Sequence, residues 1–498
     1  MRLASVLLLF AASLNAQHLD FKRVFPPEGV QHREYESTME RLERMRGGVA
    51  SNPAAAIQRY NDVLRAEVRL ESFHHLRYAT DTANVRDRDA EDALSADFDK
   101  RTAFFLNEIA RVPLDRIPER YRWFATSTRA SLPPVPAAPM ATSWASELHD
   151  LLGDNGQREL YAFTLLRLAR NGNAIAQLQG AKDAPAAAYA RSGLTRDDVN
   201  KVLDAVAAHA GLYKRYLALG NPPANPPSFS FDDARRIILA SVGPAGAAYH
   251  RDLEALLDPA NGRIDLGPGE RRMRGGFSKG FAGFPSVFYM KDWDGSYNAM
   301  RIVAHESTHA IQRQLMSDHN VPPVYMSGPS FLAEGYAMYH ELLLAESLAH
   351  GENKAFFLRQ FLDGKGLRII FVAAAEAQLE QDVYDGVAND TIHNADDLDA
   401  LAQRTAARFG IEKLDWKAIP LMYDDPFYDF NYTLGGLVAL SLLRHPSDGY
   451  PALLANGYTD SAARLLKRFV SIDMQAPDFV DRALEVAASR LDQLAPVM

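Results

Sequence analysis

Hydrophobic residues along most of the chain recur at three- and four-residue steps, the spacing that builds one apolar face of an α-helix. Within residues 60–73 this spacing is carried by Val63, Leu64, Val68, Leu70 and Phe73. The same pattern predicts helices over residues 35–112, 143–219, 233–257, 296–316 and 330–348, and again toward the C-terminus. We therefore expect a mainly α-helical protein.

Proline and glycine interrupt the helical pattern at three places. Prolines within residues 133–139 and 222–227 remove backbone donors and predict seams between helical blocks. Glycines punctuate residues 262–290, where the run 286–290 predicts a strand. Pro285 directly before this run predicts an edge strand, because proline cannot donate to an interior ladder.

Composition and charge narrow the class of protein. The chain has 498 residues, 47% hydrophobic and 23% charged, which is ordinary for a folded protein and excludes a disordered or fibrous one. A net charge of −9 argues against a dedicated nucleic-acid binder. The sequence contains no cysteine, so any metal must be held by His, Asp or Glu.

The N-terminus has the features of an export signal. Arg2 precedes an apolar run over residues 3–12, and residues 13–16 are small or polar enough for cleavage. We interpret residues 1–16 as a signal peptide, with a buried N-terminal helix as the alternative. No later stretch reaches the roughly 20 uncharged apolar residues that a membrane span needs. The mature protein is therefore expected to be secreted or periplasmic and not to associate with a membrane.

The most informative motif is His-Glu-x-x-His, formed by His305, Glu306 and His309. On a helix, residues four apart share a face, so both imidazoles can bind one metal ion. Glu306 can reach a metal-activated water and act as general base. The alternative is an ordinary polar helix face.

A third ligand is required for a catalytic zinc, and Glu334 is the preferred candidate. It lies 25 residues after His309, beyond a loop rich in proline and glycine that lets a second helix return. Asp318 and His319 follow the first helix too closely to reach its inner face. Glu341, two helical turns beyond Glu334, can accept a hydrogen bond from a ligand imidazole, unless it is a solvated surface carboxylate. One zinc ion per chain is expected.

These residues, with the segments 233–249 and 274–278 and the strand after Pro285, resemble in order and spacing the zinc oligopeptidases related to oligoendopeptidase F and thimet oligopeptidase. The resemblance is strong over residues 190–440 and weak elsewhere. It implies a two-lobed helical metallopeptidase with a deep channel, zinc at the channel floor and a small sheet with an edge strand near the zinc. We divide the mature chain into a helical region, 17–190, and a catalytic domain, 191–498.

The resemblance also assigns roles. It implies that His305, His309 and Glu334 bind zinc, that Glu306 is the general base, and that the strand 286–290 pairs with an extended peptide.

A tyrosine-rich segment is similar to the part of these enzymes that stabilises the tetrahedral intermediate. Tyr432 is the preferred hydroxyl donor and Tyr428 the second, with aromatic core packing as the alternative. The sequence departs from the family here, because no histidine precedes these tyrosines in residues 419–423. Tyr423 is a candidate substitute donor.

The sequence thus predicts an exported zinc oligopeptidase that hydrolyses internal bonds of short peptides with a zinc-activated water. A zinc exopeptidase that releases dipeptides remains open. So does a peptide-binding protein with weak or no catalysis, which the missing histidine motivates. A helical scaffold with an accidental motif would require Glu334 to be coincidental too. The expected partners are short peptides, with no nucleic acid.

Overall fold

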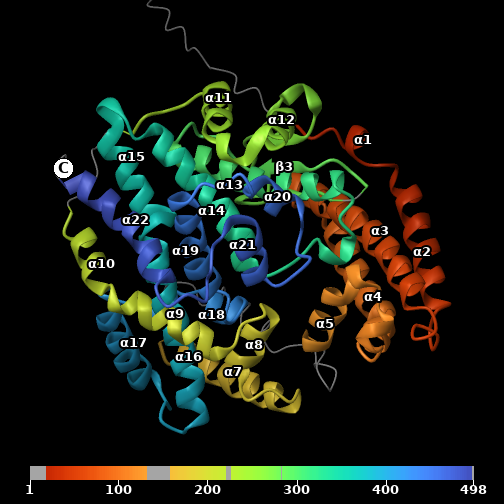
Figure 1. Cartoon of the computed structure of the whole chain (residues 1–498), viewed down its shortest axis with the longest axis horizontal. Helices are drawn as coiled ribbons and strands as arrows, with labels where there is room; N and C mark the ends of the chain where they lie inside the picture. The colour runs from red at the N-terminus through yellow and green to blue at the C-terminus, as the bar shows by residue number, and fades with distance from the viewer. Residues whose placement is uncertain (1–17, 132–157, 220–225, 282, 496–498) are drawn as a thin grey trace, which may run out of the picture.

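The computed structural model describes residues 18–131, 158–219, 226–281 and 283–495 (Figure 1). Helices make up most of these residues, around one three-stranded sheet, which confirms the mainly α prediction. None of the helices in these ranges is both long and apolar enough to cross a bilayer. The predicted signal peptide at 1–16 and the proline cluster at 133–139 lie outside the described residues.

The first helices form an N-terminal lobe with a hydrophobic core of its own, on the right in Figure 1. Side chains such as Met39, Leu70 and Phe105 are fully buried between its long helices. Asn52 starts the longest helix by accepting a hydrogen bond from the Ala55 amide. The helices are α1 (Phe21–Val24), α2 (Glu28–Glu43), α3 (Pro53–Thr80), α4 (Val85–Ile109) and α5 (Arg122–Ser131).

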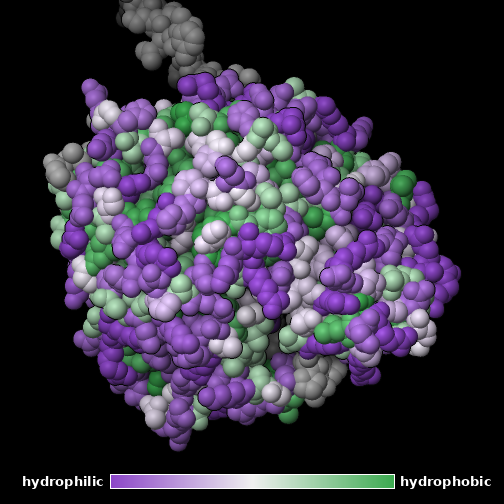
Figure 2. All heavy atoms as spheres, viewed as in Figure 1, coloured by the Kyte–Doolittle hydropathy of each residue, from purple (hydrophilic) through white to green (hydrophobic). Residues whose placement is uncertain are grey.

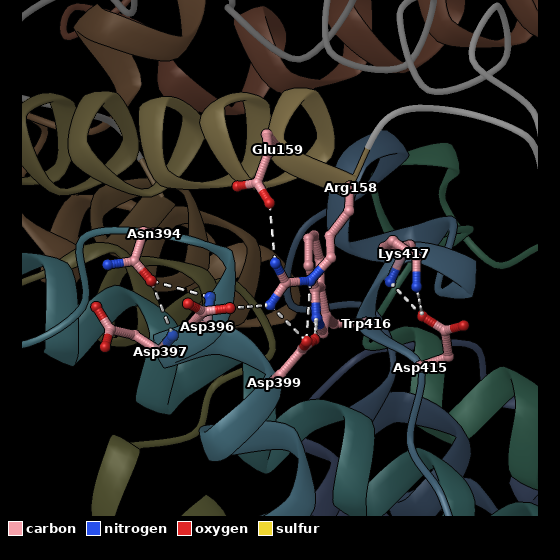
Figure 3. Close-up of polar contacts among 9 residues, drawn as sticks. All are labelled: Arg158, Glu159, Asn394, Asp396, Asp397, Asp399, Asp415, Trp416 and Lys417. Atoms are coloured by element: carbon pink, nitrogen blue, oxygen red, sulfur yellow. Dashed lines mark hydrogen bonds and ion pairs between the residues drawn. The ribbon is translucent and has the colours of Figure 1, made fainter.

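The next block packs with the C-terminal helices in a second and larger core. It contains α7 (Arg158–Leu178), α8 (Ala184–Arg191), α9 (Arg196–Ala208) and α10 (Ala210–Leu217). Figure 3 shows how the start of α7 is held: Arg158 pairs with Asp396 and Asp399, each at 2.6 Å. The indole of Trp416 donates to Asp399 at 2.8 Å. The boundary predicted at residue 190 falls inside this larger core.

The prediction of a single helix over residues 233–257 is wrong, because the structure has two helices there, separated by a short turn. Ser230 caps α11 (Phe231–Ser241) by accepting from the Asp233 amide. A 3-10 turn, Gly243–Ala245, follows, and Gly246 at φ 85° opens α12 (Gly246–Leu257) in a backbone conformation that favours glycine.

The sheet contains β1 (Ile264–Leu266), β2 (Gly276–Lys279) and β3 (Val287–Met290) in the order β1-β3-β2. β3 is parallel to β1 and antiparallel to β2. The prediction that strand 286–290 is an edge is therefore wrong. Pro285 precedes the first paired residue, Val287, so its missing N–H removes no ladder donor. The edge strand beside helix α13 is β2.

The remaining helices build the larger core: α13 (Tyr297–Asp318), α14 (Ser330–Leu348), α15 (Lys354–Phe361), α16 (Arg368–Ala388), α17 (Ala395–Phe409), α18 (Leu421–Asp424), α19 (Phe430–Arg444), α20 (Tyr450–Ala455), α21 (Ala462–Val470) and α22 (Phe479–Leu494). α14 lies at the centre (Figure 1) and packs against α13 and α19. It is buried on nearly every side, as expected for a helix that is apolar around most of its circumference.

Two glycines let α14 and α19 approach backbone to backbone. A Cβ on Gly435 would lie 3.0 Å from the carbonyl oxygen of Phe331 and 3.2 Å from the amide nitrogen of Gly335. A Cβ on Gly335 would lie 3.2 Å from the carbonyl oxygen of Gly435. Larger side chains at either position would push the helices apart.

A cavity of about 1040 Å³ lies between the two lobes. α5 lines it from the N-terminal lobe, and α8 and α9 line it from the larger core. In Figure 2 the surface is hollowed between these two sides. The cavity reaches Gly328 and Pro329, which immediately precede α14, and the side chain of Tyr458. This arrangement agrees with the expected two-lobed molecule with an internal channel, but none of the three predicted zinc ligands is among the residues that line the cavity.

The helix contact at Gly435 gives a stability prediction. Gly435→Val places methyl groups against the α14 backbone, and we expect it to lower the free energy of unfolding by about 1–3 kcal/mol, measured by denaturant titration. Gly211→Val in α10 is the matched control, because a Cβ there has no neighbour within 4 Å. Equal destabilisation by the two variants would contradict the close contact.

Candidate metal centre

His305 and His309 lie on one face of α13. Ser296 starts this helix by accepting a hydrogen bond from the Ala299 amide at 3.1 Å, and the helix then runs unbroken through the motif. The two imidazole rings are 5.0 Å apart between centroids. Their side chains are 15% and 13% exposed, so a small molecule can reach them.

Glu334 enters from α14 and completes a three-residue cluster. Its carboxylate oxygens lie 3.5 Å from Nε2 of His305 and 3.9 Å from Nε2 of His309. One ligand atom from each residue lies within 4.8 Å of the others. A tetrahedral zinc with bonds of about 2.0–2.1 Å holds its ligand atoms about 3.3 Å apart, so the donor set fits such an ion after small adjustments.

The competing candidates for the third ligand lie elsewhere. Asp318 and His319 are exposed at the C-terminal end of α13. Within the described residues, neither joins the cluster that the two histidines form with Glu334.

The electrostatics of this cluster favour a cation. Burial disfavours a charge on His305, yet hydrogen bonds to Glu334 and Glu341 raise its pKa to about 10. Burial, and then the positive charge of His305, lower the pKa of His309 to about 3. The carboxylates therefore draw one positive charge into the cluster, and a divalent ion can supply it in place of a proton.

Glu341 orients the first histidine. Its Oε1 lies 2.6 Å from Nδ1 of His305, and its side chain is 2% exposed, which confirms the predicted contact with a ligand imidazole. Its other oxygen pairs with Arg301. Burial would raise the pKa of Glu341, but these partners and Lys365 hold it at about 2. The ionised carboxylate keeps the proton on Nδ1 and turns Nε2 toward Glu334.

Glu306 follows the first histidine on α13 and borders the same space. Its Oε1 lies 4.0 Å from Nε2 of His305, and the side chain is 18% exposed. Burial, with the negative charges of Glu334 and Glu341, raises the pKa of Glu306 to about 7, against the opposing charge of His305. This carboxylate is therefore placed to accept a proton beside the ligand atoms.

The two predicted tyrosines lie close enough to Glu334 to be affected by its charge. Tyr432 lies in the first turn of α19 and Tyr428 just before that helix, with ring centroids 5.4 Å apart. Burial, and then the negative charge of Glu334, raise the pKa of Tyr432 to about 12 and also raise that of Tyr428. Both hydroxyls stay protonated near neutral pH and can donate hydrogen bonds.

Tyr423, the candidate substitute donor, does not join them. Its ring is fully buried and packs edge-on against Tyr161, with centroids 6.0 Å apart.

Two residues that position the tyrosines were missed by sequence reasoning. Phe427 adopts φ 68°, a conformation uncommon outside glycine, and its amide donates to the buried Glu380 at 2.8 Å. Asn431 donates to the Tyr428 carbonyl at 2.9 Å and accepts from the Phe331 amide at 3.2 Å. The Phe427 bond ties the turn before α19 to α16, and the Asn431 bonds tie the same turn to the start of α14.

Two cations near the site were also missed. Lys365, in the π-helical turn Leu362–Gly366, holds its Nζ 5.2 Å from the ring centroid of Tyr432. Arg313 donates to both the carbonyl and the hydroxyl of Ser278 at 3.0 Å, which ties the edge strand β2 to the helix that bears the histidines. No motif marks either residue, because distant segments bring them together.

Comparisons with known proteins agree with this architecture, although no family model matches the sequence. The chain is 23% identical over 370 residues to an oligoendopeptidase F homolog of Lactococcus lactis subsp. lactis, covering 67% of this chain and 60% of the relative. A crystal structure of a protein described as a peptidase, from Chlamydophila abortus, aligns with TM-score 0.81 and 16% identity over 97% of this chain and 98% of that one. Oligoendopeptidase-F from Enterococcus faecium aligns with TM-score 0.58 and 17% identity over 94% of this chain and 99% of that one.

These comparisons confirm the resemblance to the oligoendopeptidases that the sequence predicts, and the helical fold with it. The chain spans 60% of the length of the Lactococcus relative. The roles of the individual site residues stay predictions.

Glu341 offers a test of the metal centre that does not depend on catalysis. Glu341→Gln removes the charge that holds His305, and we expect zinc affinity, measured by competition with a chelator, to fall by about 10- to 100-fold. Glu346→Gln on the same helix is the control, because that carboxylate pairs with Arg490 instead. Unchanged zinc affinity in the Glu341 variant would refute the orienting role.

Proposed function

From this likeness to oligoendopeptidase F in sequence and fold, we propose that the chain is a zinc-dependent oligopeptidase that hydrolyses internal bonds of short peptides. One observation carries the proposal: two imidazoles and the Glu334 carboxylate converge on one point, with Glu306 beside them. A site that only binds a metal ion needs no further carboxylate beside the ligands, whereas peptide hydrolysis needs a base there.

His305, His309 and Glu334 would hold the zinc ion. When bound, zinc supplies a Lewis acid that polarises the scissile carbonyl and lowers the pKa of a water molecule. Glu306 takes a proton from the attacking water and passes it to the leaving amine, so no covalent enzyme intermediate is required. Glu341 keeps His305 in the tautomer and orientation that binding requires.

Tyr432, supported by Tyr428, donates a hydrogen bond to the carbonyl oxygen as negative charge develops on it. The histidine expected before these tyrosines is absent from residues 419–423. Lys365 provides a positive charge beside Tyr432. Burial would raise the pKa of Glu334, but the two histidines and then Lys365 lower it. We infer that this ammonium contributes the charge that the missing histidine would have supplied.

We propose that the substrate approaches through the cavity between the lobes, which is lined by Phe331 of α14 and by Phe430 and Thr433 of α19, the helices that carry Glu334 and Tyr432. About 1040 Å³ has room for a peptide of several residues but not for a folded protein, which favours short substrates. The edge strand β2 takes over the role first expected of strand 286–290, since its outer side is free of other strands. Backbone pairing to an edge strand is independent of side chains and suits broad peptide specificity.

Export of the protein to the periplasm or the medium is part of the proposal. It is supported by the charge, apolar run and small residues of positions 1–16.

The role of Glu306 is tested by Glu306→Gln. We expect both wild type and variant to bind zinc, and the variant to cleave short quenched-fluorescence peptides about 10²- to 10⁴-fold more slowly, because the water loses its base. Glu346→Gln is again the matched control. Cut sites are determined by mass spectrometry.

Each alternative has its own result in this experiment. Dipeptides released stepwise from one terminus would identify an exopeptidase. Zinc bound by the wild type without any cleavage would favour a peptide-binding protein, and wild type without zinc would refute the proposal.

Single substitutions of Tyr432 and Tyr428 test which of the two hydroxyls donates to the carbonyl oxygen. Tyr432→Phe is expected to lower kcat by about 10²- to 10³-fold with little change in KM, because the donor acts on charge that develops only in the transition state. Tyr423→Phe, a buried tyrosine that packs against Tyr161, serves as the control. A loss in Tyr428→Phe with full activity in Tyr432→Phe would reverse the assignment.

A further inference from the structure

A second group of metal-ligating side chains lies in the N-terminal lobe, on helices other than α13 and α14. Glu28 and His32 are four residues apart in the first turns of α2 and lie near His74 in the C-terminal part of α3. One ligand atom from each lies within 4.8 Å of the others. The proposed peptidase does not use these residues.

His74 is held as a ligand imidazole would be. Its side chain is 1% exposed, and its Nδ1 lies 2.6 Å from Oδ1 of Asp87. Arg77 donates to the other oxygen of Asp87 at 2.8 Å. The carboxylate is therefore ionised and can only accept, so Nδ1 carries the proton.

The other nitrogen of His74 is then left with a lone pair. Nε2 is buried and has no hydrogen-bond partner among the described residues. The ring of His74 lies 5.7 Å from that of His32 between centroids, so the imidazole with the unpartnered nitrogen stands beside the two α2 side chains. A buried acceptor without a donor is costly, and a cation at this point would satisfy it.

The same carboxylate–imidazole arrangement occurs at the candidate zinc centre. Asp87 contacts His74 at the distance at which Glu341 contacts His305, 2.6 Å in both cases. A carboxylate behind a ligand histidine fixes its tautomer and raises its basicity. The N-terminal lobe therefore repeats, on other helices, the contact that orients His305.

We propose that Glu28, His32 and His74 bind a second divalent cation of the zinc type, with Asp87 as the residue that positions His74. Two imidazoles and one carboxylate favour zinc or a neighbouring late transition metal over magnesium or calcium, which prefer oxygen. The side chains of His32 and Glu28 are 49% and 27% exposed, so the ion can enter from solvent. It would link the start of α2 to α3 and stabilise the lobe.

One existing contact competes with this ion. Arg86 donates to Glu28 at 2.7 Å, but its side chain is 72% exposed. Ion pairs of this exposed kind contribute little free energy in water, so a divalent cation can displace the guanidinium.

A third cluster of metal-ligating side chains differs in the charge of its neighbours. Glu71, His75 and Glu91 also bring ligand atoms within 4.8 Å. There the ammonium of Lys279 lies 2.7 Å from Glu71, and Nδ1 of His75 lies 2.8 Å from Glu91. A positive charge is already present, so this cluster links the lobe to β2 and is not proposed as a metal site.

Metal analysis after equilibration with zinc tests the proposal on the full chain. We expect two zinc ions per wild-type chain, one in His32→Ala and one in His309→Ala. His32 is at the surface, so its truncation should not disturb folding, and His393→Ala, another exposed histidine, should keep both ions. Asp87→Asn should weaken the second site by about 10- to 100-fold. Zinc should raise the Tm of His309→Ala more than that of the His32→Ala, His309→Ala double variant.

The metal counts show separately whether each of the two proposed sites binds zinc. One zinc in the wild type that disappears only in His309→Ala, or two ions retained in His32→Ala, would overturn the second site. One zinc retained in His309→Ala and lost in His32→Ala would uphold the second site and refute the first.

Discussion

The packing of α14 against its neighbours is the constraint on which the site depends. Gly335 and Gly435 let α14 and α19 meet backbone to backbone, so closely that a Cβ on either glycine would lie only 3.0–3.2 Å from the facing helix backbone. This close approach holds one helix between α13 and the tyrosine segment. Glu334 and Glu341, seven residues apart on α14, thereby reach the same imidazole from two sides. Without a rigid α14, neither the ligand geometry nor the tautomer of His305 would be defined.

Charge gives this geometry its chemistry. The site collects carboxylates at partial or full burial, where ionisation is costly unless a cation is near. Arginine and lysine supply part of the compensation: Arg301 pairs with Glu341, and Lys365 lowers the pKa of Glu334 after the histidines. The remaining demand for positive charge is what makes the centre suitable for a divalent ion. The cluster around His74 likewise contains a buried carboxylate, that of Asp87, next to an imidazole.

The N-terminal lobe is joined to the larger core at particular points. Tyr325 enters the core of the N-terminal lobe and donates to the Arg120 carbonyl at 2.6 Å. Tyr289 of β3 donates to the Ala79 carbonyl at 2.9 Å, and Lys279 of β2 pairs with Glu71. These contacts join the N-terminal lobe to the sheet and to the segment before α14, so the two lobes are held in a fixed relation around the cavity between them.

The sequence alone determined the features that depend on local spacing. Helical periodicity predicted the mainly α fold, and the four-residue step between His305 and His309 placed both on one face whatever the tertiary structure. The tertiary structure decided what depends on contacts between distant segments. Pro285 suggested an edge, but strand order is set by pairing, and β2 took that position. Lys365, Glu380 and Arg313 carry no local signal, because their partners lie far along the chain. Glu28 and His74 meet only because α2 packs on α3, a long-range contact that no motif records.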